Sequence, residues 1–210
     1  MVHAEKKEPD PLFIVFEGID GSGKSTQAEM LHALLKSRGI DAVRLAEPTG
    51  GKWGMEIRKM LRGDIVLSGE EQLEYFIKDR EDDIQRNIIP AMRKKITIIM
   101  DRYYYSNAAY QGAAGLSPEH IIRENKKRGF PEPDRVYLID IDPETALRRI
   151  DSRTRGGREI FEKRVFLERV REIYRSLADE KFFLLDGSGS PEGIFSIIRK
   201  DFEKIVKSRS

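Results

Sequence analysis

The feature that most constrains the fold is a glycine-rich stretch near the start of the chain, FEGIDGSGKSTQ at residues 16–27. It contains Gly18, four variable residues and then Gly-Lys-Ser at 23–25, the pattern of a loop whose backbone N–H groups surround phosphate oxygens. An apolar run of buried-strand type at 12–16 precedes it, and apolar residues at helical spacing follow it up to Gly39. A chance match in a turn between core elements is the alternative, but strand, loop and helix occur in the required order. The stretch therefore predicts a phosphate-binding site.

The chemistry of this loop follows from its residue types. The ammonium group of Lys24 supplies a mobile positive charge for the β and γ phosphates of a nucleotide, and the hydroxyl of Ser25 is a ligand for Mg²⁺. Glycines let the backbone turn left-handed and come close to the ligand. We therefore predict that the nucleotide phosphates are bound by Gly18, Asp20, Gly21, Ser22, Gly23, Lys24, Ser25 and Thr26.

Length and composition limit the classes of protein that remain. At 210 residues the chain is long enough for one domain, which we place at 12–210 after a charged tail at 1–11. Lys and Arg number 38 against 36 Asp and Glu, and this balance argues against a nucleic-acid-binding protein. The absence of cysteine excludes disulfides, thiolate metal sites and cysteine nucleophiles. No apolar stretch approaches the ~18 residues that cross a bilayer, so we expect a cytoplasmic protein without membrane contact.

Apolar runs of β type recur at 42–45, 96–100, 136–141 and 182–185, and helical pattern separates each run from the next. Strands that alternate with helices form a mostly parallel sheet whose two faces are covered by helices. Together with the run at 12–16, they predict an α/β fold with a five-stranded parallel sheet.

Local capping patterns predict where several helices begin. Ser68 and Glu71 form the pattern of a capping box ahead of a long helix. The pairs at 117–118 and 142–143 each combine a side chain suited to an N-cap with a proline suited to the first turn. Isoleucines at helical spacing within 194–205 predict a final amphipathic helix.

One segment does not fit the core pattern. Residues 151–158 read DSRTRGGR, with three arginines and two glycines between two predicted helices. An exposed connecting loop is one interpretation. Beside a phosphate-binding loop we favour a lid at about 151–160, in which glycines act as hinges and Arg153, Arg155 or Arg158 neutralises the transferring phosphoryl group.

The residues that end the predicted strands are candidates for the site, because parallel sheets bind ligands beyond the carboxyl ends of their strands. Glu47 follows the run at 42–45, and Asp101 and Arg102 follow the run at 96–100. We expect Asp101 to hold Mg²⁺ through water or to orient other polar groups, and Arg102 to clamp a phosphate with two hydrogen bonds. An exposed ion pair of little energetic value is the alternative for these two residues.

A second group of residues suits a planar base. Phe76 and Arg80 lie four residues apart on the long predicted helix and so share a face. Asn107, Tyr110 and Gln111 have the same spacing on the segment after the third strand. Each has an ordinary structural role open to it, as a core aromatic, an ion-pair partner or a surface amide. Only their combination predicts a pocket that stacks on a ring and hydrogen-bonds its edge.

Four stretches carry a resemblance to a known family: FEGIDGSGKSTQ at 16–27, LEYFIKDR at 73–80, DRYYYSNAAYQG at 101–112 and DIDPETALRRI at 140–150. Together they resemble thymidylate kinase over nearly all of the chain from Leu12 onward. The resemblance implies the P-loop NTPase fold of the nucleoside monophosphate kinases, with an Arg-rich lid, in a homodimer. It also implies the phosphorylation of dTMP to dTDP with ATP and Mg²⁺, a step of dTTP biosynthesis.

The resemblance also assigns roles in the dTMP pocket. It implies that Phe76 stacks on the thymine ring, while Arg80 and Asn107 hydrogen-bond the edge of the base. Tyr110 would crowd the 2′ position of the sugar and so favour deoxyribose. Asp20 would accept a hydrogen bond from the 3′-hydroxyl.

Two positions depart from the family pattern, and both concern phosphate contacts. By resemblance Arg102 bridges the acceptor and donor phosphates. Many bacterial relatives have an arginine immediately before the Glu-Pro pair of the second loop, which here is Glu47-Pro48 after the run at 42–45. This chain has Ala46 at that position, and we expect Arg58 to compensate. Some relatives place an arginine within the phosphate loop, where this chain has Ser22. The arginines of the lid are then the expected source of positive charge on the transferring group.

Other readings of the phosphate loop stay open. A kinase for a nucleoside would need a base near the accepting hydroxyl. A GTPase switch would carry an Asn-Lys-x-Asp signature, which residues 125–128 (NKKR) do not complete. A pure binding protein would leave the arginines of the lid without a purpose. We find no adenine-specific motif, and the turn at 187–193 is the candidate contact for that base.

Overall fold

The computed structural model describes residues 11–150 and 158–209 of the chain. Among these residues five strands form one sheet, in which every neighbouring pair is parallel and the order is β2-β3-β1-β4-β5. The strands are β1 (Phe13–Glu17), β2 (Ala42–Ala46), β3 (Thr97–Asp101), β4 (Arg135–Asp140) and β5 (Phe182–Asp186). Both ends of each predicted run agree with its strand to within one residue, and the predicted α/β fold with a five-stranded parallel sheet is confirmed.

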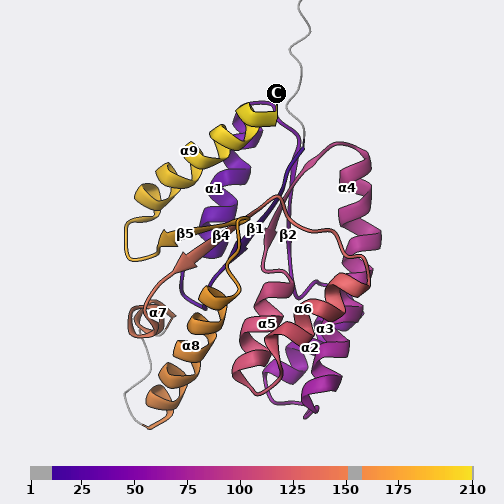
Figure 1. Cartoon of the computed structure of the whole chain (residues 1–210), viewed down its shortest axis with the longest axis vertical. Coiled ribbons are helices and arrows are strands. Elements are labelled where there is room, and N and C mark those ends of the chain that lie inside the picture. The colour runs from indigo at the N-terminus through magenta and orange to yellow at the C-terminus, as the bar shows by residue number, and fades with distance from the viewer. Residues whose placement is uncertain (1–10, 151–157, 210) are drawn as a thin grey trace, which may run out of the picture.

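Helices connect the strands and surround the sheet (Figure 1). They are α1 (Lys24–Ser37), α2 (Lys52–Leu61), α3 (Gly69–Asp83), the π-helical η1 (Ile84–Ile88), α4 (Ile89–Arg93), α5 (Tyr104–Ala113), α6 (Pro118–Lys127), α7 (Pro143–Ile150), α8 (Arg158–Ser176) and α9 (Pro191–Arg209). Within the described ranges, none of them is both long enough and apolar enough to cross a membrane.

The helix starts expected from local signals are confirmed. Ser68 and Glu71 form both hydrogen bonds of a capping box at the start of α3. The side chains of Ser117 and Asp142 each accept a hydrogen bond from the backbone N–H group three residues later, at 3.1 and 2.8 Å. These bonds satisfy N–H groups that have no partner within the helix, so each helix begins where its cap lies.

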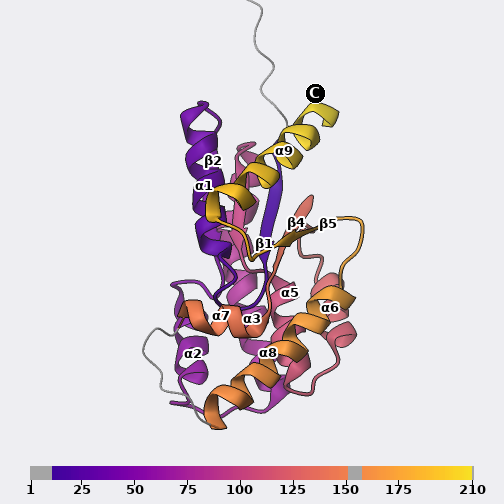
Figure 2. The same cartoon turned by 90° about the vertical axis from the view of Figure 1, so that its left-hand side faces the viewer.

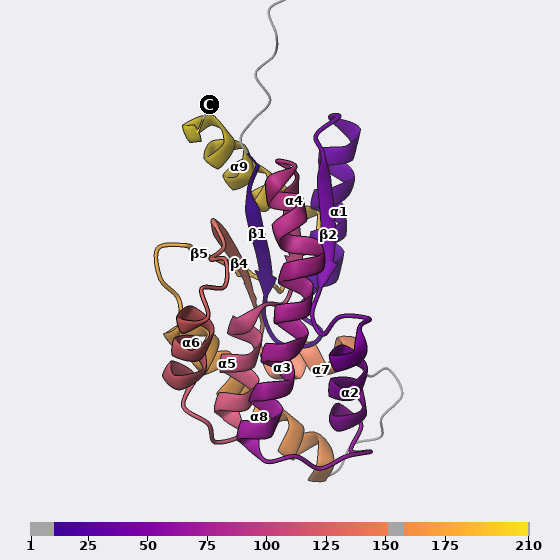
Figure 3. The same ribbon diagram turned by 90° about the vertical axis from the view of Figure 1, so that its right-hand side faces the viewer.

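Two layers of helices bury the sheet. On one face α1 and α9 lie side by side (Figure 2) and pack Leu31, Leu35, Ile194 and Ile198 against the strands. The other face is covered by the rod of α3, η1 and α4 and by α5 and α8 (Figure 3). All five residues of β1 are buried, because this central strand is covered on both sides.

The helices at the carboxyl ends of the strands form the other half of the molecule. Figure 3 shows α2, α5, α7 and α8 beyond the sheet, and α3 running from this half up alongside the strands into η1 and α4. The carboxyl end of β1 leads directly into the glycine-rich loop and α1, and that of β3 leads into α5. Residues from these separate segments therefore meet at one end of the sheet.

Two predictions concern residues at the limits of the described part. Arg153 and Arg155 of the predicted lid lie outside the described residues, and Arg158 is described only as the first residue of α8. The predicted tail, residues 1–11, lies outside them except for its last residue. The lid, the tail and the single domain at 12–210 therefore stay predictions.

Candidate active site

The glycine-rich loop packs tightly between the ends of β4 and α7. Gly18 and Gly21 have φ angles of 141° and 80°, in the region that residues with a side chain rarely adopt. A Cβ atom on Gly18 would lie 2.5 Å from the backbone oxygen of Ile139, and one on Gly21 would lie 2.4 Å from that of Ala146. Glycine is therefore required at both positions by backbone conformation and by space. The loop lines a cavity of about 570 Å³.

Lys24 lies at the floor of this cavity. Its side chain is almost fully buried, and its Nζ atom donates a hydrogen bond of 2.9 Å to the backbone oxygen of Ile19. Burial, together with the nearby positive charge of Arg102, lowers the pKa of Lys24 to about 7. A phosphate group in the cavity would favour the charged form, so the ammonium group is suited to an anionic ligand.

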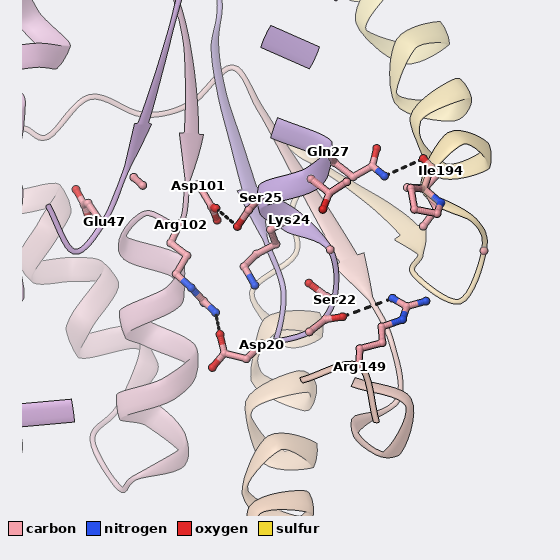
Figure 4. Close-up of a pocket in the computed structure, with 16 residues that line it drawn as sticks. Asp20, Ser22, Lys24, Ser25, Gln27, Glu47, Asp101, Arg102, Arg149 and Ile194 are labelled. Carbon is pink, nitrogen blue, oxygen red and sulfur yellow. Dashed lines mark hydrogen bonds and ion pairs between the residues drawn. The ribbon is translucent and has the colours of Figure 1, made fainter. Parts of the chain in front are cut away.

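Ser25, in the first turn of α1, faces Asp101 at the end of β3. The Ser25 hydroxyl donates a hydrogen bond of 2.5 Å to Oδ2 of Asp101, as Figure 4 shows. Asp101 is the last residue of β3 and pairs with Phe16 of β1, and this register sets it beside the start of α1. A hydroxyl and a carboxylate oxygen are the ligand types that Mg²⁺ prefers, so this pair fits the expected ion.

Arg102 follows Asp101 and turns sharply out of the sheet, with a φ angle of 69°. Its Nη2 atom donates to the carboxylate of Asp20, and its guanidinium group lies over the ring of Tyr110, 5.1 Å from the ring centre. Burial alone would raise the pKa of Asp20, but the charges of Arg102 and Lys24 hold it below its usual value. Figure 4 shows these charged groups on the same side of the loop.

A second cavity, of about 310 Å³, adjoins the first. Asp20, Glu47 and Arg102 line both cavities and so mark their junction. The second cavity is also lined by the predicted base-binding residues Phe76, Asn107, Tyr110 and Gln111, together with Pro48, Met60, Leu61, Gln72, Tyr103, Ser106, Ala114 and Phe166. The structure thus brings together four of the five side chains that the sequence grouped around a planar ligand.

Gln111 presents an unpaired amide to the second cavity. Its side chain is 5% exposed, yet neither its Oε1 nor its Nε2 atom has a hydrogen-bond partner among the described residues. An unpaired buried amide costs free energy that a bound polar group would recover. The amide of Gln111 therefore offers an oxygen acceptor and an NH₂ donor group to the edge of a ligand.

Arg80, the fifth predicted base-binding residue, lies behind this cavity and does not line it. It is fully buried, and its guanidinium group donates to the Glu47 carboxylate, to Oδ1 of Asn107 at 2.7 Å and to Oδ1 of Asn125 at 2.7 Å. Because a guanidinium group only donates, the oxygen of Asn107 must face Arg80, and its NH₂ group is the part of this amide left for a ligand. A direct bond from Arg80 to a base stays a prediction.

Glu47 is buried beside Arg80. Burial raises the pKa of Glu47, and the neighbouring charge of Arg80 opposes that rise. One carboxylate oxygen accepts from Arg80, while Oε1 has no partner among the described residues. Glu47 thus joins the second loop to α3 and keeps one oxygen available at the junction of the cavities.

Arg58, expected to replace the arginine absent at Ala46, has its guanidinium group committed elsewhere. It donates to the backbone oxygens of Thr49 and, at 2.6 Å, of Pro48. Arg58 lines neither cavity, whereas Ala46 lines the first. Its contact with an acceptor phosphate stays a prediction.

Several residues of the first cavity were not predicted. They are Gln27, Arg149 and Ile194, while Gly189 and Pro191 fall within the turn at 187–193 that was expected to meet the adenine. The amide of Gln27 donates a hydrogen bond of 2.9 Å to the backbone oxygen of Pro191 and so ties α1 to α9. Arg149 approaches the loop from α7, with its Nη1 atom 3.5 Å from the oxygen of Gly21 (Figure 4). Among these unpredicted residues, Arg149 lies in a stretch that the sequence analysis had singled out, DIDPETALRRI at 140–150.

Comparisons with known proteins agree with this geometry. The family model described as thymidylate kinase matches residues 16–198. A thymidylate kinase of Leptospira interrogans is 40% identical over 204 residues, which cover 97% of this chain and 100% of the relative. A probable thymidylate kinase of Archaeoglobus fulgidus is 40% identical over 195 residues, covering 93% of this chain and 96% of the relative. The matched part contains the phosphate loop and both cavities, and the chain belongs to the thymidylate kinase family.

Proposed function

We propose that this protein transfers the γ-phosphoryl group of ATP to dTMP and forms dTDP and ADP. The observation that carries the proposal is the junction of the two cavities. The phosphate loop lines one cavity, aromatic and amide side chains line the other, and Asp20, Glu47 and Arg102 line both. A donor and an acceptor bound in these cavities would present their phosphates to each other beside Arg102.

The acceptor needs no catalytic base. The second pKa of a phosphate monoester is about 6, so a nucleoside monophosphate is already a dianionic nucleophile at neutral pH. The task of the protein is to hold two anions in line and to stabilise the charge on the moving group. We assign this task to Lys24, which lines the first cavity, and to Arg102, which lines both. The arginines of the predicted lid would add to it.

The proposed metal site is Ser25 with Asp101. Mg²⁺ held there would neutralise part of the charge of the donor phosphates. Asp101 would hold the ion through its carboxylate or through water, and Ser25 would contribute its hydroxyl oxygen. The short hydrogen bond between these two side chains supports the assignment, because it shows that both oxygens point to one place.

We assign the thymidine part of the acceptor to the second cavity. Phe76 would stack on the base, and the amides of Asn107 and Gln111 would bond its edge. Tyr110 lies beside the phosphate loop, since its hydroxyl accepts a hydrogen bond of 3.0 Å from the backbone N–H group of Asp20. A ring fixed at that point would leave little room for a 2′-hydroxyl group and so favour deoxyribose.

The family resemblance also leads us to propose a homodimer. Apolar side chains on and after α2 support a protein contact there: Met55, Leu61 and Val66 are 55%, 65% and 94% exposed. Light scattering coupled to size-exclusion chromatography tests the assembly. A monomer at micromolar concentration would contradict it.

The proposed reaction is tested by coupled ADP release with ATP and Mg²⁺. The panel of acceptors contains dTMP, dUMP, UMP and thymidine, each varied in concentration. We expect the highest kcat/KM for dTMP, weak activity with UMP and none with thymidine, which lacks the nucleophilic phosphate. If no monophosphate accelerates ADP release above the ATP-only rate, the proposed function is wrong.

A further inference from the structure

A buried carboxylate lies beneath Arg102 and has no part in the function proposed above. Glu17 ends β1 and is fully buried, although it directly precedes the phosphate loop. Its carboxylate accepts hydrogen bonds from the Ser106 hydroxyl at 2.5 Å and from the Tyr174 hydroxyl at 2.9 Å. It also accepts from the backbone N–H groups of Tyr103 and Ser106, at 2.8 and 3.2 Å. We call Glu17, Ser106 and Tyr174 the Glu17 cluster.

The cluster connects three segments that are distant in sequence. Glu17 belongs to β1, Ser106 to the first turn of α5, and Tyr174 to the last turns of α8. The carboxylate also replaces the missing cap of α5, whose N-cap residue Tyr103 makes no side-chain capping bond. Burial raises the pKa of Glu17, and the hydroxyl and backbone donors around it act in the opposite direction.

The same two hydroxyl oxygens face Arg102. Its Nη1 atom donates to the Ser106 oxygen at 3.0 Å and, at 3.4 Å each, to the Tyr174 oxygen and to the backbone oxygen of Gly18. A guanidinium group can only donate and an ionised carboxylate can only accept, so each hydroxyl directs its hydrogen to Glu17 and a lone pair to Arg102. The two hydroxyls therefore link a buried anion to the cation at the junction of the cavities.

We infer that Tyr174 and Ser106 are positioning residues that hold the guanidinium group of Arg102 in place through Glu17 before the substrates bind. This inference rests on the proposed function, in which Arg102 bridges the two phosphates. The Nη1 edge of Arg102 is held by the cluster, while its Nη2 atom lies toward Asp20 and Tyr110, at the junction. A guanidinium group fixed in this way need not be reoriented during phosphoryl transfer, which is the condition for effective electrostatic stabilisation.

Tyr174→Phe tests the inference because it removes one hydroxyl and keeps the ring. A hydrogen bond to a charged group corresponds to about a 10- to 100-fold change in rate. Since Ser106 still holds Arg102 in this variant, we expect kcat to fall about tenfold, with the KM values for both substrates changed less than about threefold. Ser106→Ala, which leaves α8 untouched, is the second variant should Tyr174→Phe not fold.

Tyr137→Phe is the matched control. Tyr137 is also fully buried, and its hydroxyl donates to the Asp201 carboxylate at 3.1 Å beneath α9, on the other face of the sheet. We expect this variant to lose stability comparably and to keep kcat. A merely structural role for Tyr174 predicts instead that the two variants behave alike.

A double-mutant cycle decides whether Tyr174 acts through Arg102. In the Arg102→Ala background, Tyr174→Phe should cause no further loss of single-turnover rate. An undiminished tenfold loss in that background, or wild-type kcat in Tyr174→Phe alone, would overturn the inference.

A measurement without substrate separates this inference from the proposed function. In ¹⁵N NMR spectra, slow rotation of the Arg102 guanidinium group gives separate Nη signals, which Arg102→Lys identifies by their disappearance. We expect this rotation, measured as exchange between the two Nη signals, to be faster in Tyr174→Phe than in the wild type and unchanged in Tyr137→Phe. An unchanged rotation rate in Tyr174→Phe would refute the positioning role, whereas failure to phosphorylate dTMP would refute only the proposed function.

Discussion

Lys24→Met should make the nucleotide-free protein more stable while it abolishes phosphoryl transfer. The ammonium group of Lys24 is buried in the loop and is repelled by the positive charge of Arg102. Among the described residues, its hydrogen bond is to the backbone oxygen of Ile19. Before a nucleotide binds, the folded state therefore holds this charge at a cost in free energy. Methionine has a similar length and no charge, so it removes that cost together with the phosphate contact.

The size of the effect follows from the pKa of Lys24, which is about 7 in the folded protein and 10.5 in its ordinary state. Below pH 7 both the folded and the unfolded chain carry the charge, and the full penalty of about 5 kcal/mol applies. Between pH 7 and pH 10.5 the folded state has lost the proton that the unfolded state keeps, so the penalty declines as the pH rises and vanishes above pH 10.5. Leaving the Ile19 oxygen unpaired costs about 1–2 kcal/mol.

The net gain for Lys24→Met is therefore about 3 kcal/mol at pH 6 and about 1 kcal/mol or less at pH 9, which corresponds to a rise in Tm on the order of 5–10 °C at pH 6. Urea unfolding monitored by circular dichroism at both pH values measures it. Lys36→Met, an exposed substitution on the same helix, is the control and should show neither the gain nor its pH dependence. A Lys24→Met protein that is no more stable than the wild type at pH 6, or that gains equally at pH 9, would refute the reasoning.

Two further predictions concern the walls of the cavities. Gly21→Ala should destabilise the protein by about 1–3 kcal/mol and weaken ATP binding in calorimetry, because its Cβ atom would lie 2.4 Å from the oxygen of Ala146. Gly189→Ala is its control, since the nearest atom there would be 3.6 Å away, and an equal loss of stability in both would contradict the steric argument. Asn125→Leu removes an acceptor from the buried Arg80 and should raise the KM for dTMP about tenfold, with little change in that for ATP. A parallel rise in both KM values would indicate a general loss of structure instead.

Local patterns predicted the parts of the fold that depend on near neighbours in sequence. The five strands are continuous apolar runs because a parallel sheet buries both faces, and they were recognised to within one residue at each end. The capping box at Ser68 and Glu71 involves residues three apart, so its signal was complete in the sequence. The phosphate loop was recognised because Gly18, Lys24 and Ser25 have the spacing of a phosphate-binding turn and lie between a predicted strand and a predicted helix.

The parts of the site that depend on distant contacts were less predictable. A bond from Arg80 to the edge of a base stays a prediction, and spacing along the chain did not reveal that its guanidinium group is buried against Glu47, Asn107 and Asn125. These three partners come from three other segments. The contact of Arg58 with a phosphate also stays a prediction, and the sequence did not reveal that its guanidinium group donates to the backbone oxygens of Pro48 and Thr49. Long cationic side chains reach many positions, so spacing along the chain does not determine their partners.

The sequence by itself determined the class of chemistry and the family, because the residues that encircle a phosphate lie next to one another along the chain. Only the tertiary structure decided which side chains share the junction of the two cavities. It also revealed Glu17, an acidic residue within an apolar strand, as the acceptor that orders Ser106 and Tyr174 beneath Arg102. Ser106 and Tyr174 lie 89 and 157 positions from Glu17 in the sequence, and the packing of β1, α5 and α8 brings the three residues together.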